Sequence, residues 1–138
     1  MTVDSQVIGY MVSEERFSDK AVILKEGSIG DWVYVILEGR VKIKKQTSRG
    51  LLTVDTLSEG NFLGEMAMLK QSNSTRSASA IADGPVVLGV LDSVRLLQEW
   101  EAQPARIKKL ISNLIQNLEE TTNKAVDMIV ASKEIKLT

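Results

Sequence analysis

The sequence predicts a mainly β fold with flanking helices, and three observations lead to this class. Between residues 21 and 91, six short runs rich in β-branched and aliphatic side chains alternate with glycine or polar residues. A polar-capped segment precedes these runs, and a long segment with helical apolar spacing follows them. Because many short strands in one chain are typical of a sandwich or a barrel, the runs are expected to close into one β domain.

The first expected element is a small helical lead-in over residues 1–16. Residues 7–11 form a short apolar run, and Ser13, Glu14 and Glu15 follow with the hydroxyl and carboxyl groups that helix N-termini favour. No residue type in this segment suggests chemistry, so the lead-in is interpreted as a structural element.

The strands are predicted from runs bounded by turn residues. Residues 32–37 are apolar throughout, which predicts a strand covered on both faces, whereas residues 40–44 alternate like a strand with one face in water. Glu38 and Gly39 lie between these two runs and are interpreted as a hairpin turn. The predicted strands cover residues 21–25, 32–37, 41–45, 51–57, 77–82 and 86–91.

Two helices are predicted after the last strand. Asp92 and Ser93 can cap a helix through Trp100, and Pro104 can open a second, longer helix. In the longer helix, apolar positions follow alternating steps of four and three. This spacing places them in one stripe, called the seam below, and is typical of a helix that packs lengthwise on a partner helix. An ordinary amphipathic helix lying on its own β domain is the alternative. The seam positions are Ile107, Ile111, Leu114, Leu118, Thr121, Ala125 and Met128.

Composition limits the classes of function. The 138 residues suit a single domain over residues 1–138, with a core that needs no disulfide or metal. The 17 basic and 18 acidic side chains nearly cancel, so no overall field favours nucleic acid or an anionic membrane. The lack of Cys and His removes thiol nucleophiles, ordinary zinc sites and histidine acid–base chemistry. We therefore expect a binding protein that is not an enzyme and holds no metal or cofactor.

The sequence also bears on where the protein works. Its first residues lack a basic segment followed by an apolar run, which is the pattern of an export signal. No stretch approaches the length of uninterrupted apolar residues that crosses a membrane. These two features lead us to expect a cytoplasmic protein without membrane contact.

Glu65 and Arg76 form the best candidate site in the sequence. They are separated by eleven positions and lie between two β-rich stretches. A glutamate can accept a hydrogen bond from a sugar hydroxyl, backbone N–H groups at a helix start can face an anion, and an arginine can bind phosphate. This combination suggests a nucleotide-phosphate site. The alternative is a structural salt bridge between two loops, which contributes about 0–1 kcal/mol if exposed.

Two stretches of the chain resemble the two halves of a cyclic nucleotide-binding domain. Residues 25–41 carry turn glycines at Gly27, Gly30 and Gly39, as does the first half of the domain in that family. Residues 58–78 resemble its phosphate-binding cassette, in which a Gly-Glu-x-Ala helix start precedes an arginine and small residues. The resemblance runs from residue 17 to the C-terminal helix. It implies a double-stranded β-helix, or jelly roll, over residues 17–91, with the cassette at 62–78 and helices at 92–138.

The resemblance implies roles for the cassette residues. Glu65 would accept a hydrogen bond from the ribose 2′-hydroxyl, and Arg76 would pair with the cyclic phosphate of cyclic AMP or cyclic GMP. The planar guanidinium can donate two parallel hydrogen bonds to two phosphate oxygens, and Ser77 could add a hydroxyl. Cyclic AMP is the expected ligand. The remaining positions expected at the anion site are Leu63, Gly64, Met66 and Ala67.

The C-terminal helix extends the resemblance to regulators of the bacterial catabolite activator type. Thr121 and Thr122 match the positions at which those regulators present two hydroxyl residues to the adenine, one from each subunit. This implies a homodimer through the C-terminal helix, with the ligand linking the β-roll to that helix. The alternative for the two threonines is a hydroxyl that bonds back to a carbonyl of its own helix.

Three other functions are alternatives to a cyclic nucleotide sensor. A degenerate domain of the same fold could bind another small ligand or none and serve only as a dimerisation module. A metal enzyme on a small β-roll would need histidines, which are lacking. A helix-turn-helix does not fit before Thr138, so we expect no direct contact with nucleic acid. The expected function is a cyclic nucleotide sensor that signals to an unknown downstream protein.

Overall fold

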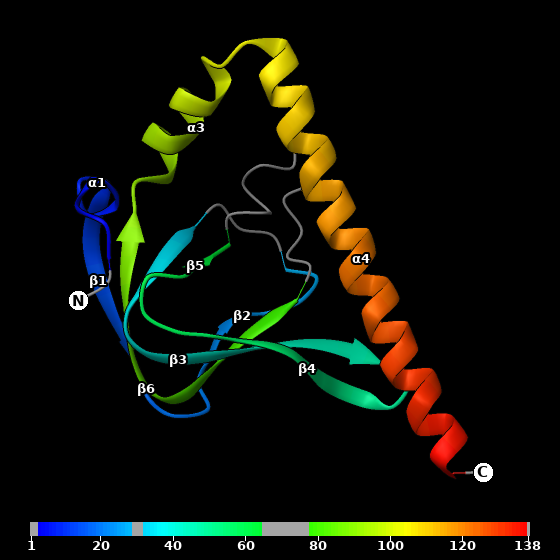
Figure 1. Ribbon diagram of the computed structural model, residues 1–138. Helices are drawn as coiled ribbons and strands as arrows, with labels where there is room; N and C mark the ends of the chain where they lie inside the picture. Colours follow the sequence, from blue (N-terminus) through cyan, green and yellow to red (C-terminus); the bar gives the residue numbers. More distant parts are fainter. Residues whose placement is uncertain (1–2, 29–31, 65–77, 138) are drawn as a thin grey trace.

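The computed structural model describes residues 3–28, 32–64 and 78–137, which form a β-roll flanked by helices (Figure 1). The strands pair antiparallel in the order β1-β6-β3-β4, with β2 on β6 and β5 on β3. This confirms the predicted class, a mainly β jelly roll with a long C-terminal helix. The strands are β1 (Met11–Phe17), β2 (Val22–Leu24), β3 (Val33–Thr47), β4 (Gly50–Leu57), β5 (Phe62–Leu63) and β6 (Ser79–Leu91).

The first half of β3 is buried on both faces, as its continuous apolar sequence predicts. One face joins a cluster inside the roll, and the other face joins a second cluster beneath the N-terminal segment and helix α3 (Ser93–Glu101). Alternate side chains of a strand point to opposite faces, so consecutive residues here enter different clusters. Ile36 belongs to the inner cluster, and Val35 belongs to the second one.

The N-terminal segment differs from the predicted helical lead-in. Helix α1 covers only Ser5–Ile8, and Met11–Phe17 form strand β1 instead. Ser13 therefore lies opposite Val90 of β6 in a ladder and does not cap a helix. Backbone hydrogen bonds to a central strand outweigh the weak helix-start signal of a few polar residues.

The predicted hairpin at Glu38 and Gly39 is also wrong. Strand β3 continues through both residues, and its register against β6 shifts on either side of Glu38. Gly39 has φ +95°, and a Cβ there would overlap the carbonyl oxygen of Pro85. Glycine is thus required here by a bulge and a close backbone approach, and the chain turns later, at residues 48–49 between β3 and β4.

Strand β6 joins two runs that the sequence analysis predicted as separate strands. It passes through Asp83, Gly84 and Pro85 without a break. The N–H of Gly84 donates to Asp19 Oδ1 at 2.7 Å, which provides a partner for this backbone group outside the ladder. Because both long strands are bent, each can take part in the two sides of the roll.

The C-terminal helices follow the predicted boundaries. Asp92 caps α3 by accepting a hydrogen bond from the N–H of Arg95 at 3.1 Å. Helix α4 (Ala105–Leu137) begins directly after Pro104 and runs along one side of the roll, where it meets the β3–β4 end (Figure 1). An ion pair of 3.5 Å between Lys108 and Glu101 bridges the turn between the two helices.

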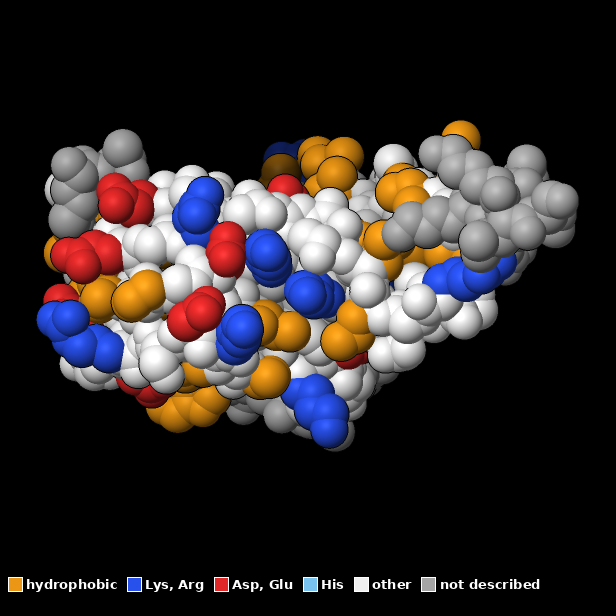
Figure 2. Space-filling view, turned by 90° about the horizontal axis from the view of Figure 1, so that it is seen from below, with side chains coloured by type: hydrophobic (Ala, Val, Ile, Leu, Met, Phe, Trp, Pro, Cys, Tyr) orange, Lys and Arg blue, Asp and Glu red, His pale blue; other side chains and the backbone are white. Residues whose placement is uncertain are grey.

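The lower face of the roll carries both basic and acidic side chains, with apolar side chains among them (Figure 2). Arg40 and Lys42 of β3 lie 3.8 and 3.9 Å from the carboxylate of Asp83 on β6. This mixture agrees with the nearly balanced composition and gives this face no continuous field of one sign. Within the part of the chain that the structure describes, no helix has the length and apolar character needed to cross a membrane.

Candidate functional site

Strand β5 leads into the predicted cassette. Leu63 is 3% exposed and pairs with Tyr34 of β3, and its side chain belongs to the core cluster inside the roll. Gly64 follows with φ +86°, a conformation that glycine adopts without strain. The predicted contact of Leu63 with a ligand can therefore come only from its backbone, whereas Gly64 turns the chain out of the strand.

The loop before β5 is tied to β3 by backbone hydrogen bonds. The N–H of Ile36 donates to the carbonyl of Asn61, and the N–H of Gly60 donates to the carbonyl of Ile36, both at 2.9 Å. The Asn61 side chain accepts from the N–H of Ser58 at 2.9 Å. These bonds hold the chain firmly up to Gly64, from which the cassette sequence continues.

The chain returns at the start of β6, where Ser79 is anchored in a similar way. Its Oγ accepts a hydrogen bond from the N–H of Glu26 at 2.9 Å. The Glu26 carboxylate in turn accepts from the N–H of Gln46 at 2.8 Å and lies 4.0 Å from Lys45 Nζ. Leu63 and Ser79, on either side of the cassette, thus pair with β3, one near its start and one near its end.

Most cassette candidates lie outside the described residues. These are Glu65, Met66, Ala67, Arg76 and Ser77. Their roles toward the ribose and the phosphate stay predictions from the sequence. What the structure describes is the frame that holds the two ends of their segment.

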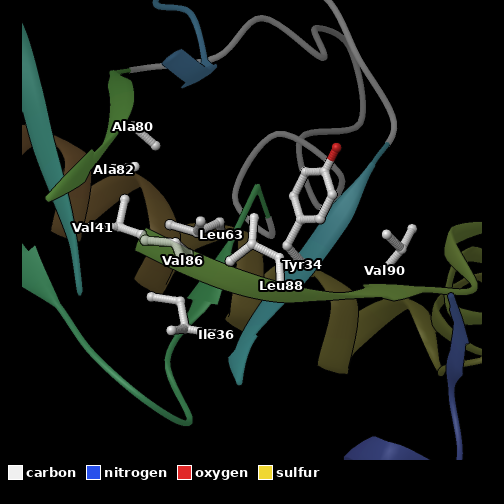
Figure 3. Packing of buried hydrophobic residues seen from close by; sticks show 9 residues of the cluster. All are labelled: Tyr34, Ile36, Val41, Leu63, Ala80, Ala82, Val86, Leu88 and Val90. Carbon is white, nitrogen blue, oxygen red and sulfur yellow. The ribbon is translucent and has the colours of Figure 1, made fainter. Parts of the chain in front are cut away.

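The inner cluster packs inside the roll, between strands β3, β5 and β6 (Figure 3). Aliphatic side chains from β3 and β6 make up most of it, and Leu63 joins them from β5. The Tyr34 hydroxyl points away from the aliphatic side chains, so only the ring of this residue is part of the apolar packing (Figure 3). The described core of the roll is thus packed by side chains of β3, β5 and β6.

Helix α4 has an exposed apolar face that includes most of the predicted seam. Leu118 is 61% exposed and Met128 is 73% exposed. Ile111 differs from the other seam positions because it is half-buried. Exposed apolar patches larger than a few hundred Å² are uncommon on monomeric proteins and often mark interaction sites. The exposed positions of the seam are Ile107, Leu114, Leu118, Thr121, Ala125 and Met128.

A second face of α4 is turned toward the roll. Val126 is 7% exposed, and α4 contacts β4 in this part of the fold. Ser112, Ile115 and Glu119 are half-buried on the same side of the helix, nearer to its start. One face of the helix therefore packs on its own domain and another face is open, and a partner helix on the open face stays a prediction.

Thr121 and Thr122 lie on different sides of α4. Thr121 is on the exposed apolar face, and Thr122 lies next to the face that turns toward the roll, between Glu119 and Val126. The Thr122 hydroxyl donates to the carbonyl of Leu118 at 2.9 Å, which is the local bond considered as an alternative. Its oxygen lone pairs can still accept a hydrogen bond.

Charged residues join the N-terminal segment to α3. Tyr10 donates a hydrogen bond to the Glu99 carboxylate, and the Arg95 guanidinium lies 4.4 Å from the centroid of the Tyr10 ring. Arg95 also pairs with Glu99 at 3.5 Å. The hydrogen bond to Glu99 is the main cause that raises the pKa of Tyr10, and Arg95 opposes this effect. This cluster links elements at opposite ends of the sequence.

The described residues contain no metal-binding group of His, Cys, Asp and Glu side chains. Within the described residues, the sequence patterns did not single out Glu119, which is half-buried on the side of α4 that turns toward the roll. It precedes Thr122 by three positions, so the two residues share a side of the helix.

Comparison with known sequences identifies one domain. A family model described as "Cyclic nucleotide-binding domain" matches residues 14–103. The CRP-like cAMP-activated global transcriptional regulator of Mycobacterium tuberculosis is 30% identical over 111 residues, which are 78% of this chain. The aligned part is 47% of that regulator, so the chain spans about half the length of this curated relative.

Solved structures give the same match. The EAL enzyme Bd1971 in its cAMP-bound form is 27% identical with a TM-score of 0.70, covering 91% of this chain and 32% of that one. Its cGMP-bound form is 28% identical, also with a TM-score of 0.70. A cyclic nucleotide-binding domain from Methylobacillus flagellatus is 28% identical with a TM-score of 0.63, covering 92% of this chain and 70% of that one.

Proposed function

We propose, since this chain belongs to the cyclic nucleotide-binding domain family, that it is a sensory domain whose ligand is a cyclic nucleotide. The observation that carries the proposal is the family match over residues 14–103, which includes the whole cassette and both of its anchored ends. Cyclic AMP is the expected ligand, because the curated relative is named for it. Related solved domains hold cyclic AMP or cyclic GMP, so both nucleotides belong in the first test.

The proposed binding site uses the cassette that the sequence identifies. Arg76 pairs with the cyclic phosphate and Glu65 accepts from the ribose, with backbone N–H groups of residues 63–67 beside the phosphate. Ser77 adds a hydroxyl. The pairing of Leu63 with Tyr34 and the hydrogen bond from Glu26 to Ser79 support this assignment, because they fix the chain on either side of the cassette.

We further propose that the ligand couples the roll to α4. A nucleotide that contacts both the cassette and Thr122 favours the helix position in which both contacts exist, and this difference in affinity is the switch. Thr121 lies on the exposed apolar face and would reach the ligand of a second subunit in a homodimer. The large exposure of Leu118 and Met128 in a single chain supports a partner helix on this face.

The output of this sensor is proposed to be regulatory and not catalytic. The relative from Mycobacterium tuberculosis is a regulator, and the match to the EAL enzyme covers only about a third of that enzyme. The 17 basic and 18 acidic side chains nearly cancel, which favours no direct contact with nucleic acid. A downstream protein or domain would then receive the signal.

Isothermal titration calorimetry tests the proposed function directly. Purified protein is titrated with cyclic AMP, cyclic GMP and the linear 5′-monophosphates as controls. We expect saturable heat with at least one cyclic nucleotide and much weaker binding of the linear ones. An absence of heat with both cyclic nucleotides at high micromolar protein would exclude the receptor and leave the alternative of a dimerisation module.

A further inference from the structure

Ser79 is the first residue of β6, where the chain enters the sheet after the cassette. It lies opposite Lys44 in the last pair of the β3–β6 ladder, and β2 runs alongside this part of β6 (Figure 1). The last pair of a ladder has sheet neighbours on only one side, so it opens more readily than the pairs in the middle of a strand. A further bond at Ser79 therefore decides how firmly this end of the chain is held.

The Ser79 side chain makes such a bond. Its Oγ accepts a hydrogen bond from the N–H of Glu26 at 2.9 Å in a partly buried position. The Glu26 carboxylate accepts from the N–H of Gln46 at 2.8 Å through one oxygen, and its other oxygen lies 4.0 Å from Lys45 Nζ. The Glu26 and Lys45 side chains are only 29% and 18% exposed, so salt screens this pair less than a surface pair. These four residues, called the Ser79 cluster below, join the start of β6 to the second half of β3.

The Ser79 cluster is close in sequence to the residues predicted to bind the phosphate. Arg76 and Ser77 lie outside the described residues and precede Ser79 by three and two positions. Three residues of extended chain span at most about 11 Å, so the position of Ser79 limits the places that the Arg76 backbone can reach. Two parallel hydrogen bonds from a guanidinium to a phosphate depend on distance and angle. Fixing Ser79 therefore reduces the entropy that is lost when these contacts form.

We propose that Ser79 and Glu26 are positioning residues for the phosphate contacts of Arg76 and Ser77. The proposal rests on the proposed cyclic nucleotide function. Neither residue has to touch the ligand, because Ser79 holds the end of the cassette and Glu26 attaches Ser79 to β3. Cyclic AMP and cyclic GMP carry the same cyclic phosphate, so loss of the Ser79–Glu26 bond should weaken the binding of both by the same factor. This equal effect distinguishes a phosphate-positioning role from a contact with the base.

The first test compares Ser79→Ala with Ser79→Thr by calorimetric titration with both nucleotides. Alanine removes the acceptor for the N–H of Glu26, whereas threonine keeps a hydroxyl and suits a β-strand. We expect Ser79→Ala to lose about fivefold in affinity for each nucleotide, the loss typical of one hydrogen bond. The ratio of the two affinities should not change, and Ser79→Thr should bind both nucleotides as the wild type does.

Thr47→Ala is a matched control for the loss of a hydroxyl that binds backbone groups. Thr47 Oγ1 accepts from the N–H of Arg49 at 3.1 Å and donates to the carbonyl of Gly50 at 2.7 Å, so its bonds stay within the turn between β3 and β4. Thr47→Ala should lower the melting temperature and leave both affinities unchanged. An equal loss of affinity in Thr47→Ala and Ser79→Ala would show a general effect of stability and overturn the positioning role.

A double variant tests whether Ser79 acts through Arg76. Lysine binds phosphate as a point charge and needs a less exact orientation than arginine. Ser79→Ala should therefore cost less affinity in an Arg76→Lys chain than in the wild type. The same further loss in both chains would contradict a role through Arg76.

A measurement on the wild-type chain covers the case in which Ser79→Ala does not fold. If the Ser79–Glu26 bond favours ligand binding, the ligand must stabilise this bond in turn. Hydrogen exchange of the Glu26 amide should therefore slow when saturating cyclic AMP or cyclic GMP is added. Unchanged exchange at Glu26, or wild-type affinities in a folded Ser79→Ala, would overturn the positioning role. If the wild-type chain binds neither nucleotide, the proposed function itself fails, which is a distinct result.

Discussion

Tyr10 donates a hydrogen bond to the carboxylate of Glu99, which lies 89 residues further along the chain. The Arg95 side chain covers the Tyr10 ring and pairs with the same carboxylate. The carbonyl of Tyr10 also accepts from the N–H of Asp92 at 2.7 Å. The start of β1 and helix α3 are thereby held as one unit, and α3 leads directly into α4.

The first prediction concerns this unit. Tyr10→Phe should lower the melting temperature, because Glu99 loses a hydrogen-bond donor while the ring that Arg95 contacts is kept. Thermal unfolding of Tyr10→Phe, Glu99→Gln and the double variant measures the coupling between the two side chains. Strictly additive effects would show that the hydrogen bond contributes nothing to stability.

The same bond predicts a pH dependence. The folded state raises the pKa of Tyr10 above its ordinary value of 10.0, chiefly through the hydrogen bond to Glu99. A raised pKa means that the stabilisation is fully present below the unfolded pKa and is lost as the pH rises through the folded value. The difference in stability between wild type and Tyr10→Phe should therefore shrink above about pH 10. Urea unfolding at neutral and alkaline pH measures it.

A second prediction concerns the phosphate. Arg76→Ala should weaken cyclic nucleotide binding by about 2–5 kcal/mol, because the phosphate and Glu65 would lose the cation between them. Arg16→Ala is a suitable control, since Arg16 is an exposed arginine of the edge strand β1. Titration calorimetry gives both values. Unchanged affinity in Arg76→Ala would refute the assigned phosphate role.

Thr122 gives a third prediction. Thr122→Ala should change the ratio of cyclic AMP to cyclic GMP affinity more than it changes the part of the affinity that comes from the phosphate. The reason is that the hydroxyl is proposed to contact the base. Thr53→Ala on the exposed side of β4 serves as a control for the loss of a threonine hydroxyl. An equal loss of affinity for both nucleotides would argue against a contact with the base.

The exposed apolar face of α4 predicts the oligomeric state. Leu118→Glu should abolish a homodimer and leave the monomer folded, because this side chain is 61% exposed in a single chain. Asn113→Glu adds the same charge at an exposed position outside the seam. Sedimentation velocity with and without cyclic nucleotide distinguishes the variants. A wild-type chain that stays monomeric under all conditions would exclude the dimer.

Gly39 provides a prediction about the fold. Gly39→Ala should destabilise the chain by about 3 kcal/mol or more, because its positive φ and the Pro85 carbonyl both conflict with a Cβ. Gly50 is a matched control with φ +94° and open space around its Cβ position. Gly50→Ala should lose only about 1–2 kcal/mol, the cost of the left-handed conformation alone. Equal losses in urea unfolding would argue against the close approach.

Local residue patterns predicted much of the fold. Three features were predicted correctly because each depends on neighbours in the sequence. They are the cap at Asp92, the helix after Pro104 and the strand at residues 33–37 that is covered on both faces. The cassette candidates were also found by type and spacing. The exact contacts of Glu65 and Arg76 remain predictions, since they lie outside the described residues.

By itself the sequence determined the mainly β class, the two C-terminal helices and the residue types available for a phosphate and a ribose. Only the tertiary structure decided that residues 11–17 form a strand and that β3 continues through Gly39, because both depend on hydrogen bonds to β6, far away in the chain. It also divided α4 into an open apolar face and a face that turns toward the roll and buries Val126. A periodic sequence marks the faces of a helix, but only packing decides which of them is covered.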